Sequence, residues 1–369
     1  MTAKEMVHAI KAYISASGYR CSEGLIENFY LGLKGKAFVM LAGSSAVEKY
    51  RLGELFAQTV GATAANGRYK LLQVRPDWLA PSDLFGRVNL EGVFLPGAVI
   101  DFVKQAQDDS AKPYFLCLSG INLSSVEYYL SDVVRGLENR TAPEKQPLLT
   151  EKYYGPDQDA ARKYGTLYVP ENLYVIGTVN MDEASYPLNQ RFLDRVHTME
   201  VTKDDLVLEK ADTKPQPLDV SNDAFLPRYL QIEREGEHWD FVLKCFAIFQ
   251  RINSILVKAR AYIEYTLRDD VILYLLHNLQ EDIMPENMAM DIAIIQKVLP
   301  RVQGSGKAVG QTLSALFAYC ADRPEEAAAL SAEMYTAAQA PSCKYPKTVG
   351  KLAVMAEQLE KDNFAALWM

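Results

Sequence analysis

The chain has 369 residues, of which 49% are hydrophobic and 23% are charged. That balance predicts a globular protein with a sizeable core and excludes a disordered chain. The net charge of -8 excludes a strongly basic chain, although a local patch can still touch nucleic acid. Its apolar runs fall short of the roughly 20 residues that a membrane span needs. The N-terminus lacks a secretory signal pattern, so we expect a cytoplasmic protein without membrane contact.

The cysteine content also favours a cytoplasmic protein. The chain has five cysteines, an odd number without CxxC spacing, and only four scattered histidines. This pattern predicts reduced, mostly buried thiols rather than a disulfide framework or a zinc site.

In chain order, the apolar spacing first predicts two short helices, at 3–16 and 23–34. Strand patterns then alternate with helical ones, and this βαβ order predicts a mainly parallel sheet with helices on both faces. The expected strands are 37–43, 69–76, 113–120, 173–180 and 197–201, and the helical patterns between them are 49–60, 97–107, 125–138 and 187–195.

Two irregular stretches interrupt this order. The polar, proline-containing segment 139–172 is expected to be a surface loop, and 203–239 is expected to be a linker. From 240 onward the patterns are helical. We therefore expect four parts: N-terminal helices at 1–36, an α/β core at 37–202, the linker at 203–239 and a helical domain at 240–369.

After the first core strand, where a phosphate-binding loop would lie, comes "GSSAVEKY", which taken alone is too degenerate to identify such a loop. Such a loop needs glycines for its turn, a lysine for the phosphates and a Ser or Thr for magnesium. Gly43 and Lys49 have the right spacing, but Glu48 replaces the second glycine and Tyr50 replaces the magnesium hydroxyl. Beside phosphate, at roughly 5 Å and an effective dielectric near 20, the Glu48 charge costs about 3 kcal/mol per pair. We expect Lys49 to be a solvated lysine at a helix start.

Three longer segments carry a resemblance to a known family: 69–86 with "VRPDWLAPSDLFG", 112–140 with "FLCLSGIN", and 173–201 with "VIGTVNMDE". They closely resemble the McrB-like branch of the AAA+ nucleotidases, the motor subunits of modification-dependent restriction systems. The similarity continues through "TLRDDVILYLL" and to the C-terminal "YPKTVGKLAVMAEQLEKDNFAALW". It implies an AAA+ core with a C-terminal helical lid, often assembled as a ring, with each nucleotide held between neighbouring subunits.

The resemblance also locates the residues that normally hold magnesium and activate water. In this family the third strand ends in an Asp and a Glu, the Walker B pair. Here those positions are Ser119 and Gly120. Serine is a weak neutral ligand for a cation that prefers carboxylates, and glycine has no side chain to orient water. Both positions are therefore expected to be structural.

Two sensor positions remain in the sequence. Asn180 matches the residue that contacts the γ-phosphate or the attacking water (sensor 1), although an Asn that caps the next helix is an equal alternative. Arg268 matches the lid sensor arginine (sensor 2), and Asp269 and Asp270 beside it offer an ordinary ion pair instead.

Arg191 and Arg195 lie four residues apart on one expected helix, where an AAA+ subunit presents an arginine finger to its neighbour. Either is a candidate finger. Pairing of Arg195 with Asp194 or Asp182 is the alternative.

Together these losses predict a McrB-like AAA+ pseudo-nucleotidase that acts as a non-hydrolysing assembly or regulatory subunit of a restriction or phage-defence complex. We expect no resident cofactor and only weak binding of ATP or GTP with magnesium. The expected partners are AAA+ subunits, either copies of this chain or an active paralogue, and a McrC-like nuclease, with nucleic acid reached through the complex.

Two alternatives stay open. The first is a divergent but active ATPase or GTPase motor of a McrBC-type system, which replaces the missing groups from elsewhere, for instance from Glu127, Asp132 or a neighbouring subunit. The second is a module that binds nucleic acid or a partner protein through 88–97, an expected hairpin.

Overall fold

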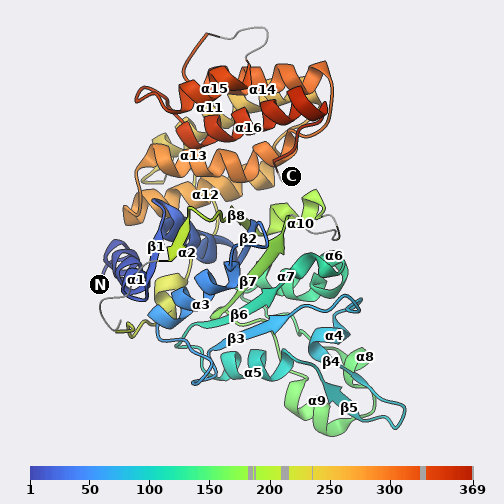
Figure 1. The fold of residues 1–369 in the computed structure, drawn as a ribbon. Helices are drawn as coiled ribbons and strands as arrows, with labels where there is room; N and C mark the ends of the chain where they lie inside the picture. The colour runs from blue at the N-terminus through green and yellow to red at the C-terminus, as the bar shows by residue number, and fades with distance from the viewer. Residues whose placement is uncertain (182–185, 187, 209–215, 235, 325–329, 368–369) are drawn as a thin grey trace. The chain divides into compact units, whose positions relative to one another are not determined.

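In a computed structural model, the chain divides into an α/β unit, Met1–Leu226, and a helical unit, Pro227–Met369 (Figure 1). The structure describes residues 1–181, 186, 188–208, 216–234, 236–324 and 330–367. Each unit has its own core and is described by itself.

Five parallel strands form the sheet of the α/β unit, in the order β3-β6-β7-β2-β8. Every residue of β2 is buried, which is typical of a parallel sheet covered on both faces. Numbered along the chain, the order is 2-3-4-1-5, the arrangement of an AAA+ core. The predicted α/β fold class is confirmed, and each expected strand is present: β2 (Phe38–Gly43), β3 (Tyr69–Gln73), β6 (Tyr114–Ser119), β7 (Leu173–Asn180) and β8 (His197–Glu200).

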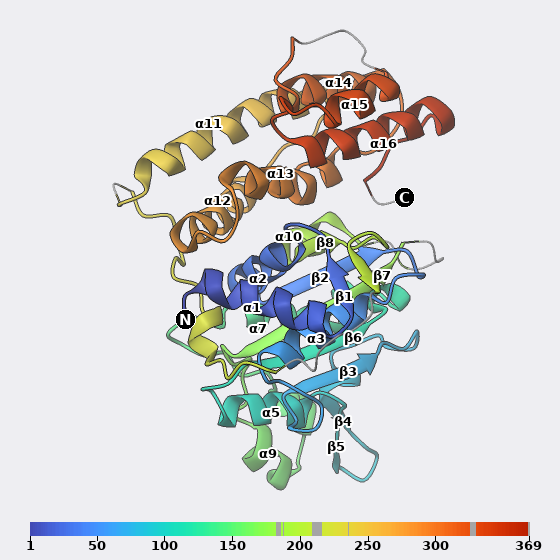
Figure 2. The same cartoon turned by 60° about the vertical axis from the view of Figure 1, so that its left-hand side comes forward.

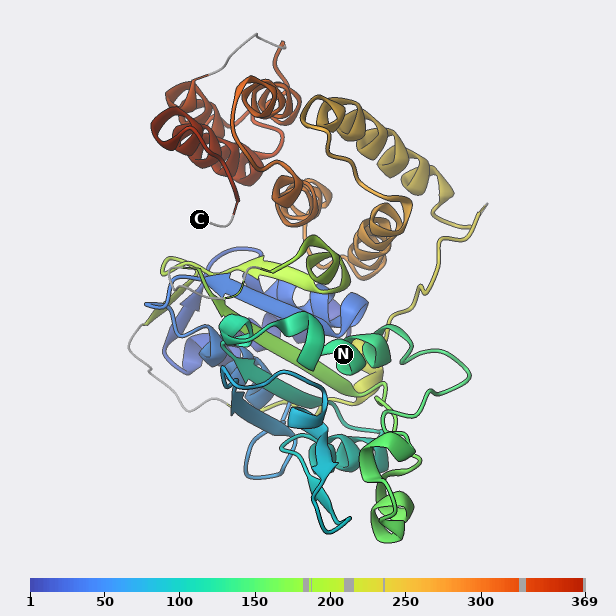
Figure 3. The same ribbon diagram turned by 90° about the vertical axis from the view of Figure 1, so that its right-hand side faces the viewer.

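Helices cover the two faces of this sheet. The first three lie against one face (Figure 2), where Phe56 of α3 meets Phe115 of β6 with ring centroids 6.1 Å apart. Three later helices lie against the opposite face (Figure 3), where Phe192 of α10 meets Phe38 of β2 at 5.8 Å. The first set is α1 (Ala3–Ala16), α2 (Leu25–Lys36) and α3 (Lys49–Thr59); the second is α6 (Val126–Tyr129), α7 (Ser131–Glu138) and α10 (Gln190–Arg195).

The expectation of a surface loop at 139–172 is wrong in part, because this segment forms α8 (Glu151–Tyr154) and α9 (Gln158–Tyr164). The side chain of Asp157 caps α9 by accepting from the backbone N–H groups of Asp159 and Ala160. Both helices are too short for a periodic pattern to reveal them, and side-chain contacts with neighbouring elements fix them in place.

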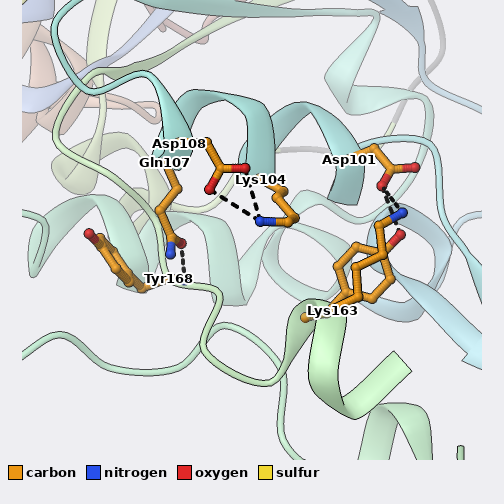
Figure 4. A network of polar contacts seen from close by, with 7 residues as sticks. Asp101, Lys104, Gln107, Asp108, Lys163 and Tyr168 are labelled. Carbon is orange, nitrogen blue, oxygen red and sulfur yellow. Dashed lines mark hydrogen bonds and ion pairs between the residues drawn. The ribbon is translucent and has the colours of Figure 1, made fainter. Parts of the chain in front are cut away.

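Those contacts begin with a polar network on α5 (Ile100–Asp108) (Figure 4). Asp101 accepts hydrogen bonds from Tyr164 at 2.7 Å and from Lys163 at 2.9 Å, and these bonds lower the pKa of its carboxyl. On the same helix, the side-chain oxygen of Gln107 accepts from the backbone N–H of Tyr168 at 3.1 Å. The network attaches the 158–168 segment to the core.

The expected hairpin at 88–97 is present as β4 (Gly86–Val88) paired antiparallel with β5 (Phe94–Pro96), after the short helix α4 (Ser82–Phe85). The inner side of this hairpin is held by residues of the 139–172 segment. The ring of Phe94 lies 5.6 Å from that of Tyr164, and its N–H donates to Asp157 at 2.9 Å. Outside, Leu90 is fully exposed, and Val93 and Leu95 are about half exposed.

Part of the expected linker at 203–239 belongs to the α/β unit. Leu206–Leu208 forms β9, which pairs antiparallel with β1 (Tyr19–Cys21), a pair that the sequence patterns did not predict. The 3-10 turn η2 (Asn222–Phe225) buries Phe225 completely among core rings. The chain leaves this unit directly afterwards.

In the helical unit, the helical character expected from 240 onward is confirmed. Buried Asp291 joins two of these helices, because its carboxylate accepts from the backbone N–H groups of Lys347 and Thr348 at the start of α16. No described helix combines the length and apolarity needed to cross a membrane. The helices are α11 (Trp239–Leu256), α12 (Tyr265–Glu281), α13 (Glu286–Lys297), α14 (Lys307–Cys320), α15 (Ser331–Ala338) and α16 (Pro346–Asp362).

Candidate functional site

Neighbouring strands bring four of the expected site positions together. β6 ends at Ser119 and Gly120 follows it, β7 ends at Asn180, and β2 ends at Gly43, in register with Asn180. In open parallel sheets, ligands bind outside these carboxyl ends. Ser119, Gly120, Asn180 and the loop that begins at Gly43 therefore share the edge where a nucleotide would bind.

Lys49 does not have the environment that we expected. Its side chain is only 2% exposed rather than solvated. The ammonium donates to the carbonyl oxygens of Gly43 at 3.1 Å, Ser44 at 2.7 Å and Val47 at 3.4 Å. The loop is thus closed around its own lysine, with carbonyl oxygens directed at the ammonium.

The backbone of this loop also differs from a phosphate cradle. No residue from Gly43 to Tyr50 has a positive φ, so the left-handed turn that glycines supply to such a loop is missing. Gly43 is needed for a different reason, since a Cβ there would lie 2.3 Å from the carbonyl oxygen of Val201. Glu48 is exposed, and Tyr50 is half-buried in the first turn of α3.

Ser119 and Gly120, the expected Walker B positions, lie at a tight turn. Gly120 has φ of 71° and its N–H donates to Thr178 of β7 at 3.0 Å. A Cβ at Gly120 would lie 2.9 Å from the side chain of Leu123. Backbone geometry therefore disfavours any side chain, including a catalytic glutamate, at this position.

Near Asn180, the carbonyl of that residue accepts from the side-chain amide of Asn122 at 3.3 Å. This bond joins the end of β7 to the turn after β6. Within the described residues, the helix after β7 is capped by Asn189, whose side chain accepts from the N–H of Phe192. Asn180 does not cap α10, so that alternative is excluded for this helix.

The two arginines of α10 have different roles in the fold. Arg195 forms a two-pronged ion pair with Glu138 of α7, at 2.6 and 2.5 Å, and this bond raises the pKa of the arginine. Of the partners expected from the sequence, Asp194 instead accepts from Gln190, and Asp182 lies outside the described residues.

Arg191 is exposed and forms no ion pair with any residue that the structure describes. The start of its helix is fixed, because the N–H of Asn189 donates to Glu127 at 3.2 Å. Sequence reasoning missed Asn189 and Glu138. An Asn just before an apolar helical run is a cap signal that identifies the first, whereas the second depends on how α7 and α10 pack.

In the helical unit, Arg268 is held by its own surroundings. Its guanidinium lies 4.4 Å from the ring centroid of Phe246 and 5.0 Å from that of Tyr265. It also donates to Asp269 at 2.7 and 2.9 Å, the ion pair that was the alternative to a sensor role. The two ring contacts and the ion pair together hold the guanidinium within its own unit.

Both carboxylates that could replace the missing groups have hydrogen-bond partners of their own. Glu127 accepts from Asn189 and from Ser125, and Asp132 accepts from Tyr153 at 2.6 Å and from Arg135 at 2.9 Å. Among the described residues, no group of three or more His, Cys, Asp or Glu side chains is arranged to hold a metal ion. Both carboxylates that could replace the missing groups are thus engaged within the fold.

Comparisons with known proteins add little about function. A protein-family model described as a domain of unknown function (DUF8727) matches residues 219–364, less than half of the chain. Among solved structures, the chain is similar to a "putative ATPase" from Cytophaga hutchinsonii, with 14% identity over 87% of this chain and 82% of that chain, at a TM-score of 0.39. No curated protein matches the chain.

Proposed function

We propose that this protein is a McrB-like AAA+ pseudo-nucleotidase: a non-hydrolysing assembly or regulatory subunit of a restriction or phage-defence complex. The observation that carries the proposal is the position of Lys49, whose ammonium is satisfied by carbonyl oxygens of its own loop. A phosphate has to compete with those carbonyls for the lysine.

Electrostatics reinforce this competition. A phosphate loop binds anions because its backbone N–H groups converge on the ligand. Here the converging groups are carbonyls, which carry the negative end of the peptide dipole and repel a phosphate. Exposed Glu48 adds a formal negative charge to the same loop. Opening the loop and binding an anion beside Glu48 both cost free energy, so nucleotide affinity should be low.

Hydrolysis faces a separate obstacle. Phosphoryl transfer depends on a positioned metal ion and a positioned water. Ser119 offers one neutral oxygen at the end of β6, and Gly120 offers none. Glu127 and Asp132 are held by other partners, so a divergent active enzyme would have to take these groups from elsewhere, for instance from a neighbouring subunit.

The positive part of the proposal concerns α10. The helix is fixed at its start by Asn189 with Glu127 and at its end by Arg195 with Glu138, while Arg191 points to no described acid. An arginine on a fixed helix can stabilise charge on a nucleotide bound by a neighbouring subunit, where such a finger is worth about 10³ to 10⁵ in rate. We assign that role to Arg191 and a structural role to Arg195.

The first experiment measures phosphate release by the chain alone, with ATP or GTP and magnesium. We expect none. Steady release that Lys49→Ala abolishes would overturn the pseudo-nucleotidase and favour the divergent motor. Titration calorimetry on the same sample should show no binding tighter than about 1 mM, which is about -4 kcal/mol.

The second experiment adds the intact AAA+ subunit encoded nearest to this chain and follows the phosphate that it releases. Arg191→Ala should lower the rate at least tenfold with complex formation unchanged. Arg162→Ala, at another exposed helical arginine, is the matched control and should leave the rate alone. Equal rates for wild type and Arg191→Ala would exclude Arg191 as an arginine finger and leave only an assembly role for this chain.

A second candidate function is partner or nucleic-acid binding by the hairpin β4–β5, favoured by the exposure of Leu90, Val93 and Leu95 on a hairpin whose inner side is fixed. Leu90→Asp should weaken binding of the partner protein or nucleic acid to the hairpin without changing the stability of the chain. Unchanged binding would exclude this candidate.

A further inference from the structure

The α/β unit ends at Leu226 and the helical unit begins at Pro227. Sequence patterns predict a long linker around this point, from 203 to 239. In the structure, the described residues immediately before and after the boundary are each bonded within their own unit, so the two anchored segments lie only two residues apart.

On the side of the α/β unit, the last residues are tied to the core. The ring of Phe225 lies 5.4 Å from that of Tyr174, and the hydroxyl of Tyr174 donates to the side chain of Asn222 at 2.8 Å. The carbonyl of Ala224 accepts from the hydroxyl of Tyr30 at 2.7 Å. Movement of this segment requires removing a fully buried ring from the core, at about 3–5 kcal/mol.

On the side of the helical unit, one histidine holds the first residues. The backbone N–H groups of Arg228 and Tyr229 both donate to Nε2 of His277, each at 3.1 Å. His277 lies in α12 and is 2% exposed. The hydroxyl of Tyr229 also donates to Gln280, one turn further along the same helix, at 2.9 Å.

This arrangement defines the chemistry that His277 must have. A nitrogen that accepts two N–H groups carries no proton, so the neutral ring holds its proton on Nδ1. Replacing it with an apolar side chain leaves two backbone donors without their acceptor.

Between the two anchors only Leu226 and Pro227 remain. The proline ring fixes its own φ near about -65° and restricts the preceding residue to extended conformations. Leu226 is extended accordingly, with φ of -71° and ψ of 138°. Few dihedral angles are therefore left to change.

We infer that Leu226–Pro227 is the hinge between the two units and that His277 is the positioning residue that limits it on the helical side. The two units then move as rigid bodies about a two-residue joint, not on a flexible tether. The family match at 219–364 spans both anchors and the joint. This inference does not depend on the proposed function.

The test compares two insertions in the full chain. Two glycines placed between Leu226 and Pro227 lengthen the joint. The same two glycines placed between Glu233 and Arg234 lie beyond the His277 anchor and are the matched control. Pulsed EPR reports the distance between spin labels on Asp159→Cys and Ala332→Cys, both exposed positions, in a Cys21→Ser, Cys343→Ser background.

The joint insertion should broaden the distance distribution about twofold, because a glycine pair adds free rotations; the control insertion should leave it as in the parent. Equal broadening by both insertions would show that the anchor at 228–229 does not hold. Broadening by neither would show that the joint does not govern the motion. Either result overturns the inference.

A second pair of variants isolates His277. His277→Leu removes the acceptor, so the control insertion should now broaden the distribution as much as the joint insertion does. His277→Gln keeps an acceptor at similar reach and should preserve the parent width. If His277→Leu does not fold, the two insertions and His277→Gln decide the question.

Discussion

The loop after β2 and the helix α10 after β7 follow two strands that pair with each other, and the sequence predicts nucleotidase residues in both. The loop carries Lys49, and the helix carries the two candidate finger residues Arg191 and Arg195. In the loop, Lys49 is buried and bonded to carbonyls of its own loop; in the helix, Arg191 is exposed on an element fixed at both ends. A motif residue is available for function only if the fold leaves it free, and the contacts, not the spacing, reveal this.

The largest effect that tests this comparison is on stability. In Lys49→Met the three bonds from the ammonium to the loop carbonyls are lost, although each carbonyl keeps a backbone N–H donor. A hydrogen bond to a charged group contributes about 1.5–3 kcal/mol. Water should replace part of this, so we expect a total loss of about 3 kcal/mol in the free energy of unfolding, measured by urea denaturation.

Lys203→Met, at an exposed lysine, is the control and should change stability by less than about 0.5 kcal/mol. A loss at Lys49 no greater than this control would mean that the loop is not closed around its lysine, and the loop would again be a candidate phosphate site.

The turn at Gly120 gives the next effect. Any side chain there meets Leu123 and requires a left-handed backbone, which costs about 1–2 kcal/mol for non-glycine residues. We expect Gly120→Ala to destabilise the protein by about 2 kcal/mol. Gly35→Ala, in a helix with open space around the new Cβ, should stabilise it by about 0.5 kcal/mol. The same sign for both would contradict the strained turn.

A smaller effect separates the two arginines of α10. The ion pair of Arg195 with Glu138 is about two-fifths exposed, so screening limits it to about 0.5–1 kcal/mol. Arg195→Ala should lose that amount, and Arg191→Ala should lose nothing measurable. A double-mutant cycle with Glu138→Gln checks that the pair itself is responsible. Zero coupling would return Arg195 to the list of candidate fingers.

The sheet was predictable from the sequence because its strands are buried on both faces and therefore appear as short, nearly continuous apolar runs. β7 coincides with the predicted 173–180, and the others differ by a few residues at their ends. The pair β1–β9 and the helices α8 and α9 were not predictable, since they are short and depend on contacts with residues far away in sequence.

The candidate site divides in the same way. The resemblance implies that Ser119 and Gly120 stand where the family has its magnesium and water-activating groups. It does not indicate that Lys49 is buried or that Arg195 pairs with Glu138, 57 positions earlier, because both depend on backbone direction and on how helices pack. A local helix cap such as Asn189 can be predicted from the sequence, whereas an ion pair between distant residues cannot.

The smallest effect concerns a third element, the hairpin, whose fixed inner side resembles the fixed ends of α10. Asp157 joins the hairpin to α9, and the pKa of its carboxyl is lowered by the N–H of Ala160 and then by that of Phe94. Because the folded pKa lies below the ordinary value of about 3.9, the two bonds are complete above that pH and are lost as the pH falls through the folded pKa.

The amide chemical shift of Phe94, followed by NMR from neutral pH downward, should move only in that acidic window. Asp157→Asn removes the titrating group, so its Phe94 amide should show no such step, while the amide of Phe115, bonded to the backbone of Arg68, serves as the reference in both proteins. A step that persists in Asp157→Asn would mean that another acid holds the hairpin, and its outward-facing leucines would then be less firmly positioned than Arg191.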